Sequence, residues 1–228
     1  IVHTHAAEHP GERVEVRAAY GVDDVVALER MGISGERAVL AHGVQLTKAL
    51  MARLAKLGTR VVHCPSANLK LASGIADVVS MRRAGVLVGI GADGAPCNNR
   101  LDPWTELRQA ALLAKVKQKD AAALAAADAL AMMTIDGARV LGLSDRAGSI
   151  EVGKRADVIV VDLEGAHALP GGDPVTRLVY SCTAADVREV FVDGRWIVRH
   201  REVTSLDEAR VRADAKSEAK KILRRAKL

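Results

Sequence analysis

The chain has 228 residues, of which 49% are apolar, so it is long enough and apolar enough to bury a sizeable core. It contains no run of about 20 apolar residues, which excludes an ordinary transmembrane helix, and no signal peptide is visible. The formal charge of +5 is concentrated in residues 195–228, which carry eleven Lys or Arg against five Asp or Glu. Such a charge run is typical of a solvated helix, so we expect neither a nucleic-acid nor a membrane partner.

The three cysteines, Cys64, Cys97 and Cys182, lie far apart and form no CxxC pair. An odd number without close spacing predicts neither a disulfide framework nor a zinc site built from cysteines. We therefore expect a cytoplasmic protein in which Cys64 and Cys97 are small buried residues.

Residues 1–143 alternate short apolar runs with longer amphipathic ones. Strands are predicted at 1–5, 38–42, 60–64 and 86–90, and helices at 22–31, 47–57, 75–83 and 101–117, with one or two more in 121–141. Thr47 is a candidate N-cap, Gly85 a candidate C-cap, and Pro103 lies in a first helical turn. Because the strands are apolar on both faces, the pattern indicates a parallel sheet covered by helices.

The pattern changes after about residue 143. A strand is predicted at 156–161, and a hairpin at 187–198 that turns at Asp193-Gly194. We therefore divide the chain into an α/β part (1–143), a β-rich part (144–204) and a charged C-terminal helix (205–228).

Ionisable side chains follow the predicted strands at the points where they end. These residues are His5 with Glu8, then His42, His63 and Asp93. In parallel α/β folds the loops at that end converge, and imidazole and carboxylate groups together suit a divalent metal such as zinc. The other histidines are expected to be strand packing (His3) or surface residues (His9, His167 and His200).

Five motifs occur in a fixed order along the chain. They are His5-Ala6-Ala7-Glu8, then Ala41-His42-Gly43, then His63-Cys64-Pro65-Ser66-Ala67-Asn68-Leu69-Lys70, then Asp93 followed by Asn98-Asn99, and finally GSIEVGKRADVIV at 148–160. In this order they resemble the amidohydrolase superfamily, in the branch of S-adenosylhomocysteine and 5′-deoxyadenosine deaminases and their chlorohydrolase relatives. The resemblance covers essentially the whole chain but only the later part of the family's length.

The resemblance implies an α/β fold: the C-terminal half of a TIM-like (β/α)8 barrel, strands five to eight, followed by part of a β-sandwich domain and a C-terminal helix. The family also has a His-x-His pair on strand one, which supplies two metal ligands. His3-Thr4-His5 is not expected to be that pair, because Glu8, His42 and Asp93 follow it at the spacing of strands five to eight. We therefore expect the chain to lack the first half of the barrel.

Roles for individual residues also come from the resemblance. His5 and Asp93 are expected to bind one divalent metal, Zn²⁺ or alternatively Fe²⁺, which lowers the pKa of a bound water to about 7. Asp93 also accepts a proton from that water, Glu8 carries a proton to a ring nitrogen, and His42 hydrogen-bonds the tetrahedral intermediate. Glu8 and His42 are expected to contact substrate, and Asn68 and Asn99 are further candidates for such contacts.

The implied activity is hydrolytic deamination of a purine-like or related nitrogen heterocycle, a reaction at a C–N bond other than a peptide bond. The alternative within the superfamily is a triazine or chloro-aromatic hydrolase. Glu8 and His42 favour deamination, because a ring nitrogen must be protonated before attack. Besides this small-molecule substrate, the expected partner is a second copy of the chain or the missing N-terminal half.

Two interpretations of another class must be weighed, of which the first conflicts with the local sequence and the second stays open. His5-Ala6-Ala7-Glu8-His9 also spells the inverted zinc-protease motif, which requires a helix, but β-type residues precede it and Pro10-Gly11 follows. The chain could instead be a catalytically silent fragment with an incomplete metal shell and an open sheet edge.

Overall fold

The computed structural model describes residues 1–226, which fall into two compact units. Unit 1 comprises Ile1–Lys154 and Leu163–Ala184, and unit 2 comprises Arg155–Asp162 and the chain from Ala185 onward. The β-rich part predicted at 144–204 is thus divided between the units. The last two residues of the predicted C-terminal helix, 227 and 228, lie outside the described residues.

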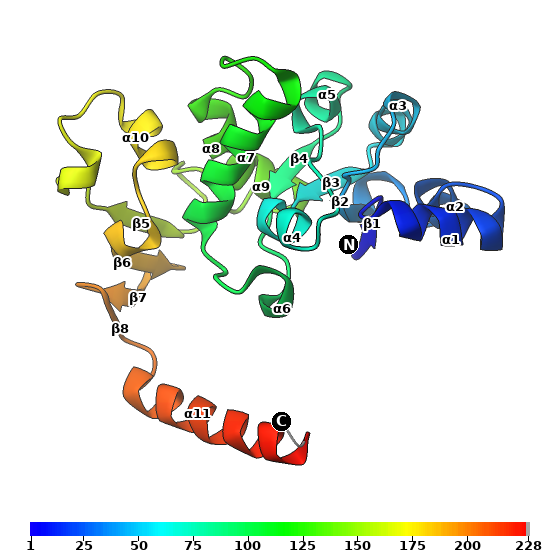
Figure 1. Ribbon diagram of the computed structural model, residues 1–228. Helices are drawn as coiled ribbons and strands as arrows, with labels where there is room; N and C mark the ends of the chain where they lie inside the picture. The colour runs from blue at the N-terminus through cyan, green and yellow to red at the C-terminus, as the bar shows by residue number, and fades with distance from the viewer. Residues whose placement is uncertain (227–228) are drawn as a thin grey trace. The chain divides into compact units, whose positions relative to one another are not determined.

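Unit 1 is built on a four-stranded sheet in which the strands follow their order in the sequence (Figure 1). The strands are β1 (Val2–Ala6), β2 (Ala38–His42), β3 (Arg60–His63) and β4 (Val88–Ile90), and every neighbouring pair is parallel. Ala6 is level with His42, and His63 is level with Ile90, so the carboxyl ends of the strands lie at one edge of the sheet. The predicted parallel α/β arrangement is confirmed.

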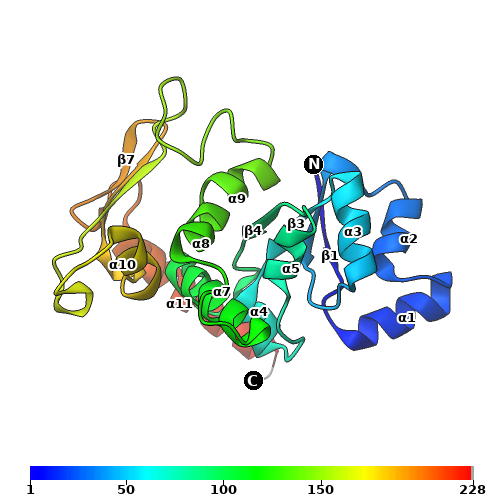
Figure 2. The ribbon, with the colours of Figure 1, turned by 90° about the horizontal axis from the view of Figure 1, so that it is seen from above.

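Helices connect and cover these strands (Figure 2). They are α1 (Pro10–Tyr20), α2 (Asp24–Arg30), α3 (Lys48–Leu57), α4 (Pro65–Lys70), α5 (Val78–Arg83), α6 (Ala95–Asn98), α7 (Pro103–Gln118), α8 (Ala126–Met133), α9 (Ile135–Val140) and α10 (Pro174–Tyr180). Leu54 of α3, Met81 of α5 and Met132 of α8 are fully buried with Val61 and Val88 of the sheet. Because aromatic residues make up only 2% of the chain, this core is filled by aliphatic side chains and methionine.

The predicted helix signals agree with the observed ends. Thr47 caps α3, where its hydroxyl accepts a hydrogen bond from the Leu50 N–H at 3.3 Å. Pro103 is the first residue of α7, and Gly85 follows α5 with φ +90°. Among the described residues no helix combines the length and the apolar character that crossing a bilayer requires.

Helix α1 was not predicted. It begins at Pro10, and the Nδ1 of His9 accepts a hydrogen bond from the Gly11 N–H at 3.1 Å, so His9 is its exposed N-cap. The structure agrees with the sequence in excluding the zinc-protease motif, because its first histidine, His5, lies in strand β1 and the helix begins only after the motif ends. The short helices α4, α6 and α10 were also missed.

Unit 2 contains a four-stranded antiparallel sheet of β5 (Val158–Val161), β6 (Val187–Val192), β7 (Arg195–Arg199) and β8 (Glu202–Val203). The predicted hairpin turn at Asp193-Gly194 is confirmed, and both residues have positive φ, as a tight hairpin turn requires. Helix α11 (Glu208–Arg225) follows, and all of its residues are exposed. The predicted solvated helix is therefore present.

Candidate active site

Three strand ends of unit 1 carry non-glycine residues in the left-handed backbone region. Ala7 follows β1 with φ 52°, His42 ends β2 with φ 79°, and Asp93 follows β4 with φ 62°. Residues other than glycine seldom adopt this conformation, and those that do are concentrated at functional sites. Three of the non-glycine residues with left-handed backbone therefore lie at the carboxyl end of the sheet, where the sequence predicts the site.

His42 lies in the middle of this group of strand ends and is completely buried. Its Nε2 is 3.4 Å from a carboxylate oxygen of Glu8 and 4.0 Å from one of Asp93. On the other side of the ring, Nδ1 is 2.8 Å from Oδ1 of Asn68. The ring of His5 stacks on that of His42, with centroids 5.4 Å apart. The structure therefore brings together five of the six predicted site residues.

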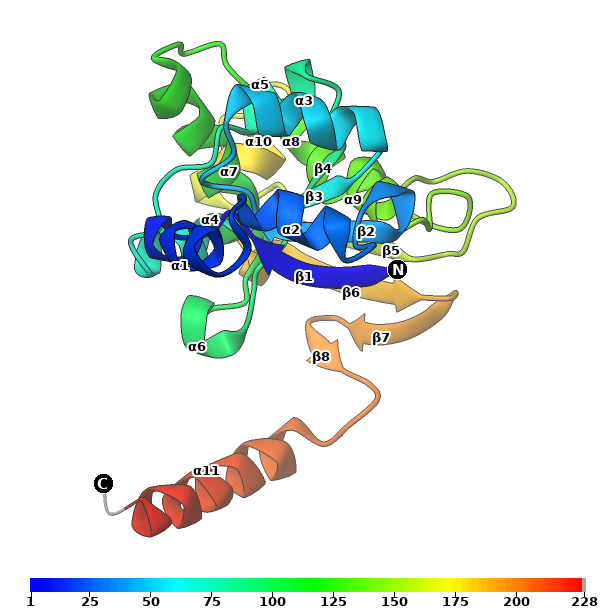
Figure 3. The ribbon, with the colours of Figure 1, turned by 90° about the vertical axis from the view of Figure 1, so that its right-hand side faces the viewer.

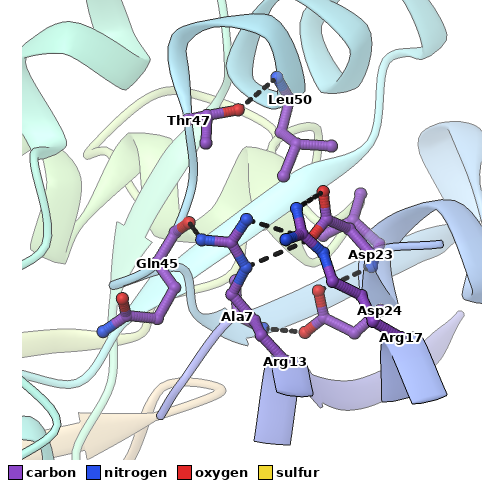
Figure 4. A network of polar contacts seen from close by, with 9 residues as sticks. Ala7, Arg13, Arg17, Asp23, Asp24, Gln45, Thr47 and Leu50 are labelled. Carbon is purple, nitrogen blue, oxygen red and sulfur yellow. Dashed lines mark hydrogen bonds and ion pairs between the residues drawn. The ribbon is translucent and has the colours of Figure 1, made fainter. Parts of the chain in front are cut away.

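The loop that carries Glu8 is held by hydrogen bonds to its backbone, of which Figure 4 shows the one at Ala7. The buried carboxylate of Asp24 accepts hydrogen bonds from the N–H of Ala7 and from that of Val25. The side-chain amide of Gln45 donates to the Glu8 carbonyl oxygen at 3.5 Å and to the Ser73 carbonyl oxygen at 2.9 Å. These contacts fix the backbone on either side of the Ala7–Glu8 bond, so that Glu8 projects from a constrained turn.

A small cluster of ion pairs lies next to that turn. Arg17 and Arg13 both donate to the Asp23 carboxylate, at 2.8 and 2.9 Å, and Arg13 also donates to the Gln45 carbonyl oxygen at 3.3 Å (Figure 4). The hydrogen bond from Arg17 is the main reason that the pKa of Asp23 lies below its usual range. Because Arg13 contacts both Asp23 and Gln45, it links helix α1 to the loop after β2.

The loop that carries Asp93 is held in a similar way. The side-chain amide of Asn98 donates to the carbonyl oxygen of Ala92 and to the Glu106 carboxylate, both at 2.7 Å. The other oxygen of Glu106, which is 1% exposed, accepts from the N–H of Ser66 at 3.0 Å. One buried carboxylate therefore joins the Asp93 loop to the start of α4.

Sequence reasoning missed the roles of Asp24 and Glu106. Both are acidic residues in the first turn of a helix, where the ordinary interpretation is a favourable interaction with the helix dipole. Only their burial, at 5% and 1% exposure, shows that they hold the loops of the site. No sequence signal distinguishes them from other acidic residues at helix starts.

The remaining candidates lie beside this cluster. Asn99 is exposed at the end of α6, and its Oδ1 accepts a hydrogen bond from the Lys70 ammonium at 2.5 Å. His63 is buried, and burial together with repulsion from His42 lowers its pKa to about 4, so it is neutral at neutral pH. Burial and the nearby carboxylates raise the pKa of the buried Cys64 to about 12, so it stays a thiol. Cys97 is only partly buried, and His3, predicted to pack on its strand, is exposed.

Comparison with known protein families agrees with this geometry. The sequence profile described as the Amidohydrolase family matches residues 1–197. The chain belongs to the amidohydrolase family. Helix α11 and the loop before it lie outside the matched range.

Relatives of this amidohydrolase chain are about twice its length. It is 44% identical over 97% of its length to a 5-methylthioadenosine/S-adenosylhomocysteine deaminase from Desulforudis audaxviator, and covers 52% of that protein. A zinc-bound adenosine deaminase from Xanthomonas campestris superposes on 97% of the chain with a TM-score of 0.94 and 40% identity, over 50% of that structure. An atrazine chlorohydrolase from Arthrobacter aurescens TC1, also complexed with zinc, superposes with a TM-score of 0.87 and 27% sequence identity. This superposition covers 94% of the chain and 48% of that structure. The chain spans about half the length of the curated relatives that it matches.

The donor atoms of the site suit a divalent metal in kind but not in number. His5 and Asp93 both flank His42, and the buried Nε2 of His42 has no hydrogen-bond partner among the described residues. Within residues 1–226, however, no three His, Cys, Asp or Glu side chains are arranged to hold a metal ion. A tetrahedral zinc site needs four ligands, so the described residues alone do not form such a site.

Proposed function

We propose that this amidohydrolase chain is the second half of a (β/α)8 barrel, with β1–β4 as strands five to eight and β5–β8 as part of a β-sandwich. The parallel order β1-β2-β3-β4 supports this assignment, because successive strands of such a barrel are neighbours. The match to only 50% of the adenosine deaminase structure supports it as well. The domain limits that we propose are 1–143, 144–204 and 205–228.

The activity proposed for the complete protein is hydrolytic deamination of an adenine nucleoside such as 5-methylthioadenosine or S-adenosylhomocysteine. The observation that carries this proposal is the approach of the Glu8 and Asp93 carboxylates to Nε2 of His42, at 3.4 and 4.0 Å. Hydrolytic removal of an amino group from a purine needs one group that takes a proton from water and another that gives one to the ring. Two carboxylates beside one imidazole provide both.

Each side chain has a separate role in the proposed reaction. Asp93 accepts a proton from the attacking water, and Glu8 delivers a proton to the ring nitrogen next to the amino-bearing carbon. Protonation makes that carbon electrophilic, and water adds to it. Asp93 then passes its proton to the amino group, which leaves as ammonia, and the proton of the added hydroxyl group returns to Glu8. His42 hydrogen-bonds the reacting oxygen through Nε2, the ring atom that faces both carboxylates. Asn99 is kept as a proposed substrate contact because it is exposed near the Asp93 loop.

His5 and Asp93 are the proposed metal ligands of this chain. Zinc is the proposed ion, supported by the zinc in the two similar structures, although Fe²⁺ suits the same ligands. When bound, the ion supplies an acidified water and polarises the reacting centre. The remaining ligands would come from outside these 228 residues, so we expect the isolated chain to be catalytically silent.

A triazine or chloro-aromatic hydrolase is the second candidate function. Its support is the likeness to the atrazine chlorohydrolase, at 27% identity. The relatives named as deaminases are more similar, at 44% identity, and the contact between Glu8 and His42 suits protonation of a ring nitrogen. A cytoplasmic location is also proposed, supported by three free cysteines.

The proposal is tested by joining the N-terminal half of the Desulforudis protein to this chain, since the chain aligns with about half of that protein. We expect the chimera to bind one zinc ion per chain and to convert the adenine nucleoside to its hypoxanthine counterpart with release of ammonia. Zinc content and the ultraviolet change of the purine are measured for the chimera and for the isolated chain. A folded, zinc-loaded chimera that releases no ammonia would contradict the proposal, and one that prefers a chlorotriazine would support the second candidate.

Two variants of the chimera separate metal binding from proton transfer. Glu8→Gln should keep the zinc but lose about 100-fold or more of the turnover, because it cannot carry the proton. Asp93→Asn should lose both, because the carboxylate is proposed to bind the ion and to accept a proton. Retention of zinc and turnover by Asp93→Asn would refute the assigned roles.

A further inference from the structure

Asn68 contacts the His42 ring at Nδ1, whereas Glu8 and Asp93 approach the ring at Nε2. Asn68 is 1% exposed, and its Oδ1 is 2.8 Å from Nδ1 of His42. We propose that Asn68 is a positioning residue: it holds the proton of the neutral His42 ring on Nδ1 and leaves the lone pair on Nε2, facing Glu8 and Asp93.

With the Asn68 amide in this orientation, the hydrogen bond determines which nitrogen of the neutral His42 ring carries the proton. An amide oxygen only accepts hydrogen bonds, so the ring nitrogen that contacts it must donate. With Nδ1 protonated, the neutral ring keeps its lone pair on Nε2, and its free position faces the carboxylates at 3.4 and 4.0 Å. The opposite amide orientation would place an NH₂ group against Nδ1, which could then never donate.

The backbone of α4 holds the Asn68 oxygen in place. The helix begins at Pro65, and the Asn68 N–H donates to the Cys64 carbonyl oxygen at 3.0 Å. The Ser73 N–H donates back to the Asn68 carbonyl oxygen at 2.9 Å, and the Ser66 N–H donates to the buried Glu106 at 3.0 Å. Helix α4 is therefore fixed at its start and at its end, with Asn68 between.

The effect of Asn68 on the reaction rests on the proposed function, whereas the position of the proton on His42 does not. Histidine in water prefers the tautomer with the proton on Nε2, so a bond from Nδ1 to Asn68 reverses the ordinary preference. The reversed ring accepts a hydrogen bond from water, or from the protonated form of Glu8, at Nε2. Asn68 thus acts on the reaction through His42 and not through contact with the substrate.

The tautomer is read directly by ¹⁵N NMR of the isolated chain at a pH where its imidazoles are neutral, with the His42 signals identified by their loss in His42→Gln. We expect the protonated nitrogen of His42 to be Nδ1. Asn68→Leu should return the proton to Nε2, and Asn68→Asp, which keeps an oxygen acceptor, should leave it on Nδ1. The matched control is Gln109→Leu in α7. The Gln109 amide accepts a hydrogen bond at 2.9 Å from the hydroxyl of Ser66, which lies in α4 as Asn68 does, but Gln109 does not contact His42.

A wild-type ring protonated on Nε2 would overturn the proposal, and so would a proton that stays on Nδ1 in Asn68→Leu. In the active chimera, Asn68→Leu should lower kcat about 100-fold with little change in KM, and Asn68→Asp should restore most of the loss. A higher KM at unchanged kcat would instead make Asn68 a substrate contact and overturn the positioning role. If the tautomer is as expected but the wild-type chimera is inactive, the proposed function fails and the tautomer assignment stands.

Discussion

At the scale of single residues, the site is held by backbone contacts more than by contacts between the side chains that are proposed to be catalytic. The left-handed conformations of Ala7, His42 and Asp93 each cost about 1–3 kcal/mol and persist only where the surroundings impose them. Asp24 imposes the first through the Ala7 N–H, and Asn98 secures the third through the carbonyl oxygen before Asp93. The direction in which Glu8, His42 and Asp93 point is therefore determined by residues that have no role in the proposed chemistry.

The burial of His63 at the carboxyl end of the sheet has a measurable effect on how the stability of the fold depends on pH. The folded-state pKa of His63 is about 4, below the unfolded value of 6.5, because burial disfavours the charged ring and His42 repels it. Between these values the unfolded chain binds a proton that the folded chain does not, so stability is complete above pH 6.5 and falls as the pH is lowered. We expect His63 to remove about 2 kcal/mol of unfolding free energy between pH 7.5 and pH 5.

Urea unfolding of the wild type and of His63→Gln at both pH values tests this expectation. The variant should be less stable at pH 7.5 because its packing changes, but its stability should fall by about 2 kcal/mol less on acidification. Above pH 7 the difference between the two proteins should be constant. Equal acid sensitivity of the two proteins would show that His63 is not held neutral.

At the scale of elements, the sequence predicted those features whose cause is local. The apolar runs gave all four strands of unit 1, and Thr47 and Asp193-Gly194 marked a helix start and a hairpin turn that the structure confirms. Helix α1 was missed because Pro10-Gly11 resembles a loop, although proline is favourable in a first turn and His9 supplies the cap. Glu106 could not be predicted, because its burial depends on packing between segments about 40 residues apart.

A comparison of Gly148 with Gly153 separates two contributions to the free energy of unfolding in the segment after α9. One is backbone strain, and the other is steric overlap with neighbouring atoms. Both glycines have φ +92°, but a Cβ at Gly148 would lie 2.6 Å from the Cβ of Ala138 in α9, whereas one at Gly153 would meet nothing within 4 Å. We expect Gly153→Ala to cost about 1 kcal/mol from backbone strain alone. Gly148→Ala should cost about 1–3 kcal/mol more, because α9 must move. Urea unfolding measures both, and equal costs would mean that α9 yields freely at this point.

At the scale of the whole molecule, the dominant feature of unit 1 is a parallel sheet with two open edges. Within the part of the chain that the structure describes, strands β1 and β4 each have a neighbouring strand on one side only, and Figure 3 shows β1 in front of the sheet. Ile1 and Val2, at the start of β1, are 56% and 49% exposed. Parallel sheets in α/β proteins are ordinarily covered and continuous, so the unpaired backbone groups and apolar side chains at this edge favour association.

We therefore expect the isolated chain to self-associate at micromolar concentrations, as measured by sedimentation velocity. Val2→Lys should weaken this association by placing a charge on the open edge. Val211→Lys is the matched control, because Val211 has nearly the same exposure, 50% against 49%, but lies on α11 in unit 2. The N-terminal half of the Desulforudis protein, added as a separate polypeptide, should replace self-association with a one-to-one complex, because it supplies strands for both edges at once. A chain that stays monomeric throughout, or that responds equally to the two substitutions, would mean that the open edge of β1 does not drive association.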